Sequence, residues 1–203
     1  ILYPANPGSV YHMTKCLDQL IFSFYNKNWG LKVTDLHQGI VWGVTTPETK
    51  VAVELQNRFD YDGLYGTVLN RFISQAMNKY PLTVYGTGGQ TRAFIHISDS
   101  AECVLLAVQN PPEAGEKVRI FNQISETRNV KELAEIVKEM FDCEIKNVEN
   151  PRKELLENEL EVENEGLRSL GFKPNILSED LLKDISALAS EMKARFDPSV
   201  ILS

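Results

Sequence analysis

The stretch GSVYHMTK at residues 8–15 is the most informative part of this chain. Tyr11 and Lys15 are four positions apart, so in a helix the phenol and the ammonium lie one turn apart on the same face. A neighbouring ammonium stabilises a phenolate, and such a tyrosine can act as an acid or a base nearer neutral pH. The spacing therefore predicts a catalytic pair, although a solvated tyrosine and lysine on an exposed face would give the same pattern.

The residues that follow predict a long helix, and Gly30 stands where a glycine commonly ends one. Apolar residues recur at helical spacing and form one stripe: Met13, Cys16, Leu17, Leu20, Ile21 and Phe24. At about 100° per residue, Tyr11 and Lys15 fall nearly opposite this stripe, which we expect to be the main buried seam of the helix. The stripe could pack on a sheet or on a second copy of the helix.

The composition is that of an acidic globular protein. The 203 residues are 43% apolar and carry a formal net charge of −7, which argues against a general nucleic-acid surface. No apolar run in the sequence reaches the roughly 18 residues that a membrane-spanning helix needs. The three cysteines match no metal-binding spacing, so we predict no metal site and expect Cys16 and Cys103 to be buried thiols.

The first nine residues read as a loop rich in proline, glycine, serine and asparagine, without a signal-peptide pattern. A catalytic-looking helix directly after such a loop is an unusual way for a protein to begin. We therefore expect these residues to be the C-terminal part of a longer chain.

Strand and helix patterns alternate along the rest of the sequence. Strands are predicted at residues 32–41, 82–85, 91–97, 118–122 and 144–148. Helices are predicted at residues 66–79, from 99 to the prolines at 111 and 112, at 129–140, and from 178 onward. Residues 45–62 are polar and predict a long loop or lid. The alternation predicts an α/β fold.

A glycine-rich segment at residues 86–89 could be mistaken for a phosphate-binding loop. It lacks the Gly-Lys-Ser/Thr ending, and a strand rather than a helix follows it, so a tight turn explains it better. The residues beside it are more informative, because Tyr85, Gln90 and Arg92 could meet an anionic ligand. Arg152 is a second candidate, although a single arginine is more often a surface residue.

The three histidines, His12, His37 and His96, match no common zinc motif. We expect His96, which lies between two isoleucines in a strand, to have a structural role. His12 is adjacent to Tyr11 but points about 100° away from it on the helix, so it could reach the same pocket only from the rim.

Several of these segments together resemble the extended short-chain dehydrogenase/reductase family. They are the Tyr-x-x-x-Lys of residues 11–15, QGIVWG at 38–43 and LTVYGTGGQTR at 82–92, with further similarity at 58–62, 66–72, 119–123 and 150–154. The resemblance implies the C-terminal half of a Rossmann-like NAD-binding domain, at residues 1–45 and 91–123. It also implies a smaller α/β substrate domain, at residues 46–90 and 124–203.

The resemblance also implies chemistry on a nucleotide sugar, with NAD as cofactor and UDP-glucose and sulfite as substrates. Tyr11, Lys15 and His12 would be catalytic, and Tyr11, Lys15, Gln38 and Gly39 would contact NAD. The substrate-binding residues would be Arg58, Asn70, Thr83, Tyr85, Gln90, Arg92, Arg152 and Glu154. His12 would assist sulfite, although a plain surface role for it is equally open, and Arg58 is the alternative.

Two alternatives remain open from the sequence: a UDP-sugar 4-epimerase or 4,6-dehydratase on the same scaffold, and a non-catalytic folded module. The glycine-rich strand–turn–helix that cradles the NAD pyrophosphate in this family is absent from these residues, so we expect them to be inactive by themselves. We further expect a homodimer, no nucleic-acid or membrane partner, and possible delivery of sulfite by another protein. The expected compartment is the cytoplasm, or the plastid stroma in a photosynthetic eukaryote.

Overall fold

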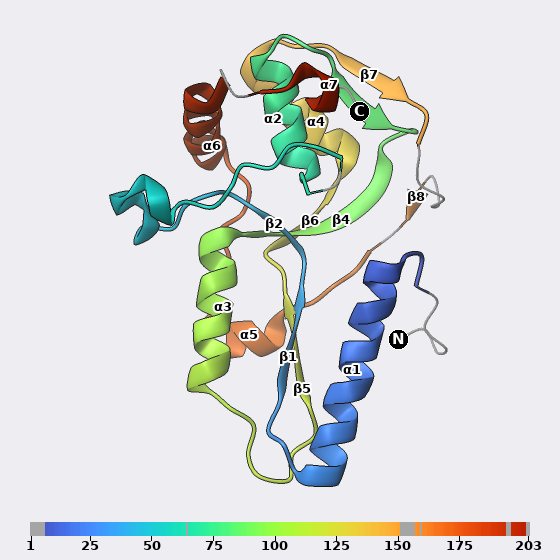
Figure 1. Cartoon of the computed structure of the whole chain (residues 1–203), viewed down its shortest axis with the longest axis vertical. Helices are drawn as coiled ribbons and strands as arrows, with labels where there is room; N and C mark the ends of the chain where they lie inside the picture. Colours follow the sequence, from blue (N-terminus) through green and yellow to red (C-terminus); the bar gives the residue numbers. More distant parts are fainter. Residues whose placement is uncertain (1–6, 64, 151–156, 159, 194–195, 202–203) are drawn as a thin grey trace.

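A computed structural model describes residues 7–63, 65–150, 157–158, 160–193 and 196–201, and it confirms the α/β fold. Figure 1 shows two parts stacked along the long axis of the molecule. In the lower part, β1 (Thr34–Gln38) and β5 (Arg119–Gln123) form a parallel pair. Helix α1 (Val10–Trp29) lies on one side of this pair, and α3 (Ile97–Gln109) and α5 (Glu165–Ser169) lie on the other.

The upper part is built mainly from helices. It contains α2 (Val68–Met77), α4 (Val130–Phe141), α6 (Glu179–Met192) and α7 (Pro198–Ile201), together with the parallel strands β3 (Leu82–Tyr85) and β7 (Ile145–Val148). A third sheet runs between the two parts in the order β2-β4-β6, and its strands are β2 (Ile40–Trp42), β4 (Gly89–His96) and β6 (Glu126–Asn129). The short strand β8 (Glu157–Asn158) pairs with the start of β4. The polar segment before α2 contains only two short 3-10 helices, Thr49–Val51 and Val53–Leu55.

The strand predicted at residues 32–41 is in fact two strands in different sheets. Gln38 pairs with Gln123 at the end of β1, and Ile40 pairs with Phe94 at the start of β2. Gly39 lies between them, and a β-carbon there would be only 2.9 Å from the carbonyl oxygen of Ala93. A glycine therefore allows the chain to pass from one sheet to the other, which a pattern of half-buried residues does not reveal.

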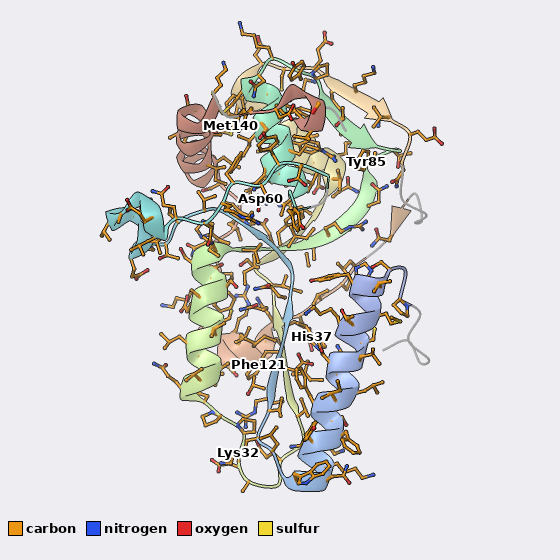
Figure 2. All side chains as sticks on the ribbon, viewed as in Figure 1. Lys32, His37, Asp60, Tyr85, Phe121 and Met140 are labelled. Atoms are coloured by element: carbon orange, nitrogen blue, oxygen red, sulfur yellow. The ribbon has the colours of Figure 1, made fainter. Side chains whose placement is uncertain are left out.

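Helix α1 turns its polar face toward β1. The side chains of Gln19 and His37 are joined by a 2.9 Å hydrogen bond, and the Asn26 amide donates to the carbonyl of Glu116 at 2.9 Å. Figure 2 shows His37 between β1 and α1. Within α1, all of which the structure describes, no residue is buried. The prediction that the apolar stripe forms a buried seam is therefore wrong here, since Leu20 and Phe24 are 66% and 55% exposed.

Two hydrophobic cores hold the elements. The upper core is centred on α2, α4 and β3, with Phe72, Ile73, Leu82 and Leu133 almost completely buried. The lower core lies between the β1–β5 pair and helices α3 and α5, and it contains Ile95, Cys103, Phe121, Leu167 and Phe172. Burial of one such large side chain stabilises the fold by about 1.5–3 kcal/mol.

The start of α4 follows the predicted capping chemistry. Asn129 accepts a hydrogen bond from the backbone N–H of Lys131 at 2.9 Å, and the Glu132 carboxylate accepts from the backbone N–H of Asn129 at 3.2 Å. This reciprocal cap is worth about 1 kcal/mol. Strand β6 directly before it, and the short helices α5 and α7, were not predicted from the sequence.

Asp99 fastens α3 to two distant segments. Its carboxylate is fully buried in the first turn of the helix and accepts hydrogen bonds from the Ser125 hydroxyl at 2.5 Å and the Asn175 backbone N–H at 2.7 Å. The Asn175 side-chain amide also donates to it. A carboxylate is favoured at a helix N-terminus, so we expect Asp99 to stabilise the packing of α3 against these two segments.

Candidate active site and nucleotide pocket

Tyr11 and Lys15 lie on the first two turns of α1, as predicted. The Lys15 ammonium nitrogen is 5.6 Å from the centre of the Tyr11 ring and 3.6 Å from a carboxylate oxygen of Asp18. Tyr11 is 66% exposed, so its phenol is open to a substrate. In Figure 1 the N-terminal end of α1 is directed up toward the level of β4 and β8. The pair therefore combines an accessible phenol with a neighbouring cation, which is what acid–base chemistry on a hydroxyl requires.

Ser9, the N-cap residue of α1, contacts both the backbone and the ring of His12. The Ser9 hydroxyl accepts the backbone N–H of His12 at 3.2 Å, and it lies 3.1 Å from His12 Nδ1. The His12 ring meets the Tyr11 ring edge-on, with 5.7 Å between their centres. His12 is thus an exposed neighbour of the phenol.

Gln38 and Gly39 lie at the carboxyl end of β1, where the chain crosses between sheets. The Gln38 amide donates to the Ser100 hydroxyl at 2.7 Å, and the Gly39 N–H donates to the Gln123 carbonyl at 3.1 Å. The carboxyl ends of parallel strands form the edge at which nucleotide ligands bind in open α/β sheets.

A cavity of about 260 Å³ lies between the start of α2 and the strands β3 and β4. Tyr85, Gln90 and Arg92, three of the residues predicted to bind substrate, line it. The rest of its wall comes from Ile40, Asp62, Gly63, Gly66, Thr67, Val68, Arg71 and Val130. Figure 2 shows Tyr85 where β3 ends and the chain turns toward β4. The glycine segment after Tyr85 is a tight turn, with left-handed Gly86 and Gly88 at φ 59° and 75°.

Arg92 is held by the neighbouring short strand. Its Nη1 donates to the Asn158 side-chain oxygen at 3.3 Å and to the Thr91 carbonyl at 3.1 Å. Gln90 is 3% exposed, and its amide donates to the Tyr85 carbonyl at 3.4 Å. Gln90 and Tyr85 are therefore linked to each other, and Arg92 is linked to β8.

Arg71 was missed by the sequence analysis, which grouped it only with its motif. It is 8% exposed, lines the cavity, and its guanidinium carbon lies 4.3 Å from the centre of the Tyr85 ring. One feature of the sequence could have identified Arg71: it is a charged residue within a predicted helix in which several nearby residues are apolar.

Other predicted substrate residues do not line the cavity. Asn70 is buried in α2 and donates to the Asp60 carbonyl at 3.0 Å, and Thr83 is bonded to Gln75 through both its backbone and its hydroxyl. The Arg58 side chain is 78% exposed and lies 3.2 Å from the Asp60 carboxylate. Arg152 and Glu154 fall outside the described residues.

The remaining ionisable groups add little to a site. His96 is buried, and its Nδ1 accepts the Ser98 backbone N–H at 3.3 Å, so it caps the start of α3. Burial, followed by the Asp99 and Glu102 carboxylates, raises the pKa of the Cys103 thiol to about 12. Cys16 is only half-buried, so the expectation of a buried thiol holds for Cys103 alone. Among the described residues, no cluster of three potential metal ligands and no helix able to cross a membrane is found.

Comparisons with known proteins agree with this geometry. The family described as "NAD dependent epimerase/dehydratase family" matches residues 2–122. The chain is 43% identical over 205 residues to the chloroplastic UDP-sulfoquinovose synthase of Spinacia oleracea, covering 98% of this chain and 42% of that protein. It is also 43% identical over 194 residues to the UDP-sulfoquinovose synthase of Sulfolobus acidocaldarius, covering 91% and 49%. The chain thus spans about half the length of the curated relatives it matches.

A solved structure shows the same fold. The UDP-glucuronic acid 4-epimerase of Bacillus cereus, in complex with UDP-glucuronic acid and NAD, superposes with a TM-score of 0.71 at 18% identity, covering 92% of this chain and 54% of that one. The family match extends over more than half of the sequence and includes the whole of α1. The chain belongs to the NAD-dependent epimerase/dehydratase family.

Proposed function

We propose that the protein containing this chain is a UDP-sulfoquinovose synthase, which makes UDP-sulfoquinovose from UDP-glucose and sulfite for sulfolipid or sulfonated-glycan synthesis. The observation that carries the proposal is the Tyr11–Lys15 pair on α1, within a chain that is 43% identical to two synthases of this kind. The family match by itself supports only the broader class of NAD-dependent epimerases and dehydratases.

The residues present fit NAD as the cofactor. Gln38 and Gly39 lie at the carboxyl edge of the parallel β1–β5 pair, and the Lys15 ammonium is exposed and able to hold a ribose hydroxyl. When bound, NAD would take a hydride from C4 of the sugar and return it at the end of the turnover.

Tyr11 would remove the proton from the sugar 4-hydroxyl as that carbon is oxidised. Lys15 would stabilise the phenolate, since its ammonium lies 5.6 Å from the centre of the Tyr11 ring. The resulting 4-keto group acidifies the C5 proton, so that proton and the C6 hydroxyl can leave as water. Sulfite can then add at C6 while a proton returns to C5. Tyr11 would finally return the proton to the oxygen at C4.

The nucleotide would bind in the cavity between α2 and β4. Tyr85, Gln90 and Arg92 line it, and Arg152 would join them from the segment after β7. Arg58, Asn70, Thr83 and Glu154 would support its edges. Asn70 would act indirectly, by donating to the carbonyl of Asp60, two residues before the Asp62 that lines the cavity.

Sulfite is an anion that must approach a sugar already carrying a diphosphate, so a local donor or positive charge is needed. His12 is our candidate, because its ring lies beside the Tyr11 ring and is exposed. Arg58 is the alternative donor, reaching from the loop before α2.

The assembly is also a proposal. The exposed apolar stripe of α1 would serve as the contact between two copies, and a separate protein could deliver sulfite. Residues 1–45 and 91–123 would belong to the NAD-binding domain, and residues 46–90 and 124–203 to the substrate domain. The compartment would be the cytoplasm, or the plastid stroma if the source is photosynthetic.

The test is to incubate the full-length protein with NAD and UDP-glucose, with and without sulfite, and to identify the products by mass spectrometry. The proposal predicts a sulfonated nucleotide sugar only when sulfite is present. An epimerised UDP-hexose as the sole product in both arms would support a 4-epimerase instead, and a 4-keto-6-deoxy sugar would support a 4,6-dehydratase.

A further inference from the structure

Arg71 places a buried positive charge in the wall of the cavity. The residue is 8% exposed and lies on α2, whereas Arg92 approaches the same cavity from β4. Removing a guanidinium from water is costly, and such groups are retained where an anion or hydrogen-bond acceptors meet them. Because Arg71 lines the cavity, an anionic ligand bound there can contact its guanidinium.

The guanidinium of Arg71 is held in a fixed orientation. It stacks at 4.3 Å from the centre of the Tyr85 ring and lies 5.6 Å from the centre of the Phe72 ring, while Nη2 donates to the Thr83 carbonyl at 3.0 Å. Thr83 is itself fixed, because its backbone N–H donates to the Gln75 side-chain oxygen at 3.0 Å. Stacking engages the face of a guanidinium, and its N–H donors lie in its plane, where phosphate oxygens are bound.

The charged residues among those that line the cavity, two arginines and one aspartate, favour an anionic ligand. Arg71 and Arg92 supply two guanidinium groups, and Asp62 is the one carboxylate among the described lining residues. Asp62 also accepts the backbone N–H of Tyr65 at 2.8 Å, which directs one of its oxygens to the protein.

We infer that Arg71 is a diphosphate-binding residue, which works together with Arg92 and is oriented by stacking on Tyr85. This inference rests on the proposed function for the identity of the ligand, a nucleoside diphosphate sugar. It adds a residue that the predicted set of Arg92 and Arg152 does not contain.

The experiment compares Arg71→Lys and Arg71→Met in the full-length protein by calorimetric titration with UDP and with uridine. Lysine keeps the charge but can neither stack on the Tyr85 ring nor make two parallel hydrogen bonds to a phosphate. Methionine removes the charge while filling similar space. Arg71→Met should weaken UDP binding about ten- to a hundredfold, and Arg71→Lys should weaken it less. Uridine binding should change less than about twofold, since uridine carries no phosphate.

Arg119→Lys is the matched control, because Arg119 pairs with Glu116 at 2.6 Å and does not line the cavity. Equal losses for UDP and uridine would overturn the inference and leave Arg71 as a support for the Tyr85 ring. Unchanged UDP affinity in Arg71→Met would overturn it as well. A wild-type protein that binds UDP but forms no sulfonated sugar would contradict only the proposed function, whereas one that binds no UDP would contradict both.

Discussion

Gln19 and His37 are joined by a 2.9 Å hydrogen bond between their side chains, and this contact shows which face of α1 meets the sheet. Tyr11, Lys15 and Gln19 recur every fourth residue, so they share that face. The same ring nitrogen of His37 also lies 3.0 Å from a carboxylate oxygen of Asp35. The Tyr–Lys pair is therefore directed to the side of the helix where β1 ends, and the apolar stripe is directed away.

Lys15→Ala should lower turnover and weaken NAD binding, because the ammonium would both stabilise the phenolate and hold the cofactor ribose. Steady-state kinetics and an NAD titration of the full-length protein measure the two effects. Lys27→Ala, in the last turn of the same helix, is the matched control and should change neither. Normal NAD affinity in Lys15→Ala would remove the second role.

Arg92→Ala should weaken UDP binding about ten- to a hundredfold, since one charge-assisted contact is worth roughly 1.5–3 kcal/mol. The loss should appear with UDP alone, in the absence of any sugar, in a calorimetric titration. Arg168→Ala is a suitable control. Arg168 lies on α5, donates to the side-chain oxygen of Asn164 and does not line the cavity. An unchanged UDP affinity in Arg92→Ala would exclude Arg92 from the diphosphate site.

His12→Ala should raise the sulfite concentration needed for half-maximal rate and leave the UDP-glucose requirement nearly unchanged. The 4-keto intermediate should still form without sulfite. Kinetics in which each substrate is varied in turn provide the measurement, with Lys27→Ala, in the last turn of the same helix, as the control. Equal effects on both substrates, or no effect on either, would remove His12 from the mechanism.

Cys103 should make the fold sensitive to alkaline pH. In the unfolded chain the thiol has its ordinary pKa of 9.0, whereas burial raises the pKa in the folded protein to about 12. Above pH 9 the unfolded state therefore binds fewer protons, and stability is lost as the pH rises through this window, by at most about 1.4 kcal/mol per pH unit.

Denaturant titrations on both sides of pH 9 measure this effect as the free energy of unfolding. The loss should be smaller in Cys103→Ala than in the wild type, after allowance for the lower starting stability of a cavity variant. Identical slopes for wild type and Cys103→Ala would contradict the assignment.

Local signals predicted much of the fold correctly. Gly30 ends α1 in the left-handed conformation with φ 64°, and the Asn129–Glu132 cap begins α4 where expected. Helix caps of this kind depend on only a few residues that are close together in the sequence. The division of a strand at Gly39 was missed, because it depends on the close approach of Ala93, more than fifty positions later in the sequence.

In the candidate site too, local motifs were recognised from the sequence and long-range contacts were not. Tyr11, Lys15 and the cavity residues Tyr85, Gln90 and Arg92 were identified from motifs. Arg71 was not, because its value comes from stacking on Tyr85, a contact between α2 and β3 that sequence spacing cannot reveal. The exposure of the α1 stripe was also unpredictable, since periodicity shows that a face is apolar but not what covers it.

The most direct test of the account is the rate of sulfonated-sugar formation by Tyr11→Phe in the full-length protein. Tyr25→Phe is the matched control, because Tyr25 is a second exposed tyrosine of α1 that packs on Phe24 and Trp29. We expect Tyr11→Phe to lose several orders of magnitude in turnover with UDP-glucose binding largely intact, and Tyr25→Phe to remain active. Near-normal turnover in Tyr11→Phe would contradict the assignment of the catalytic centre to α1.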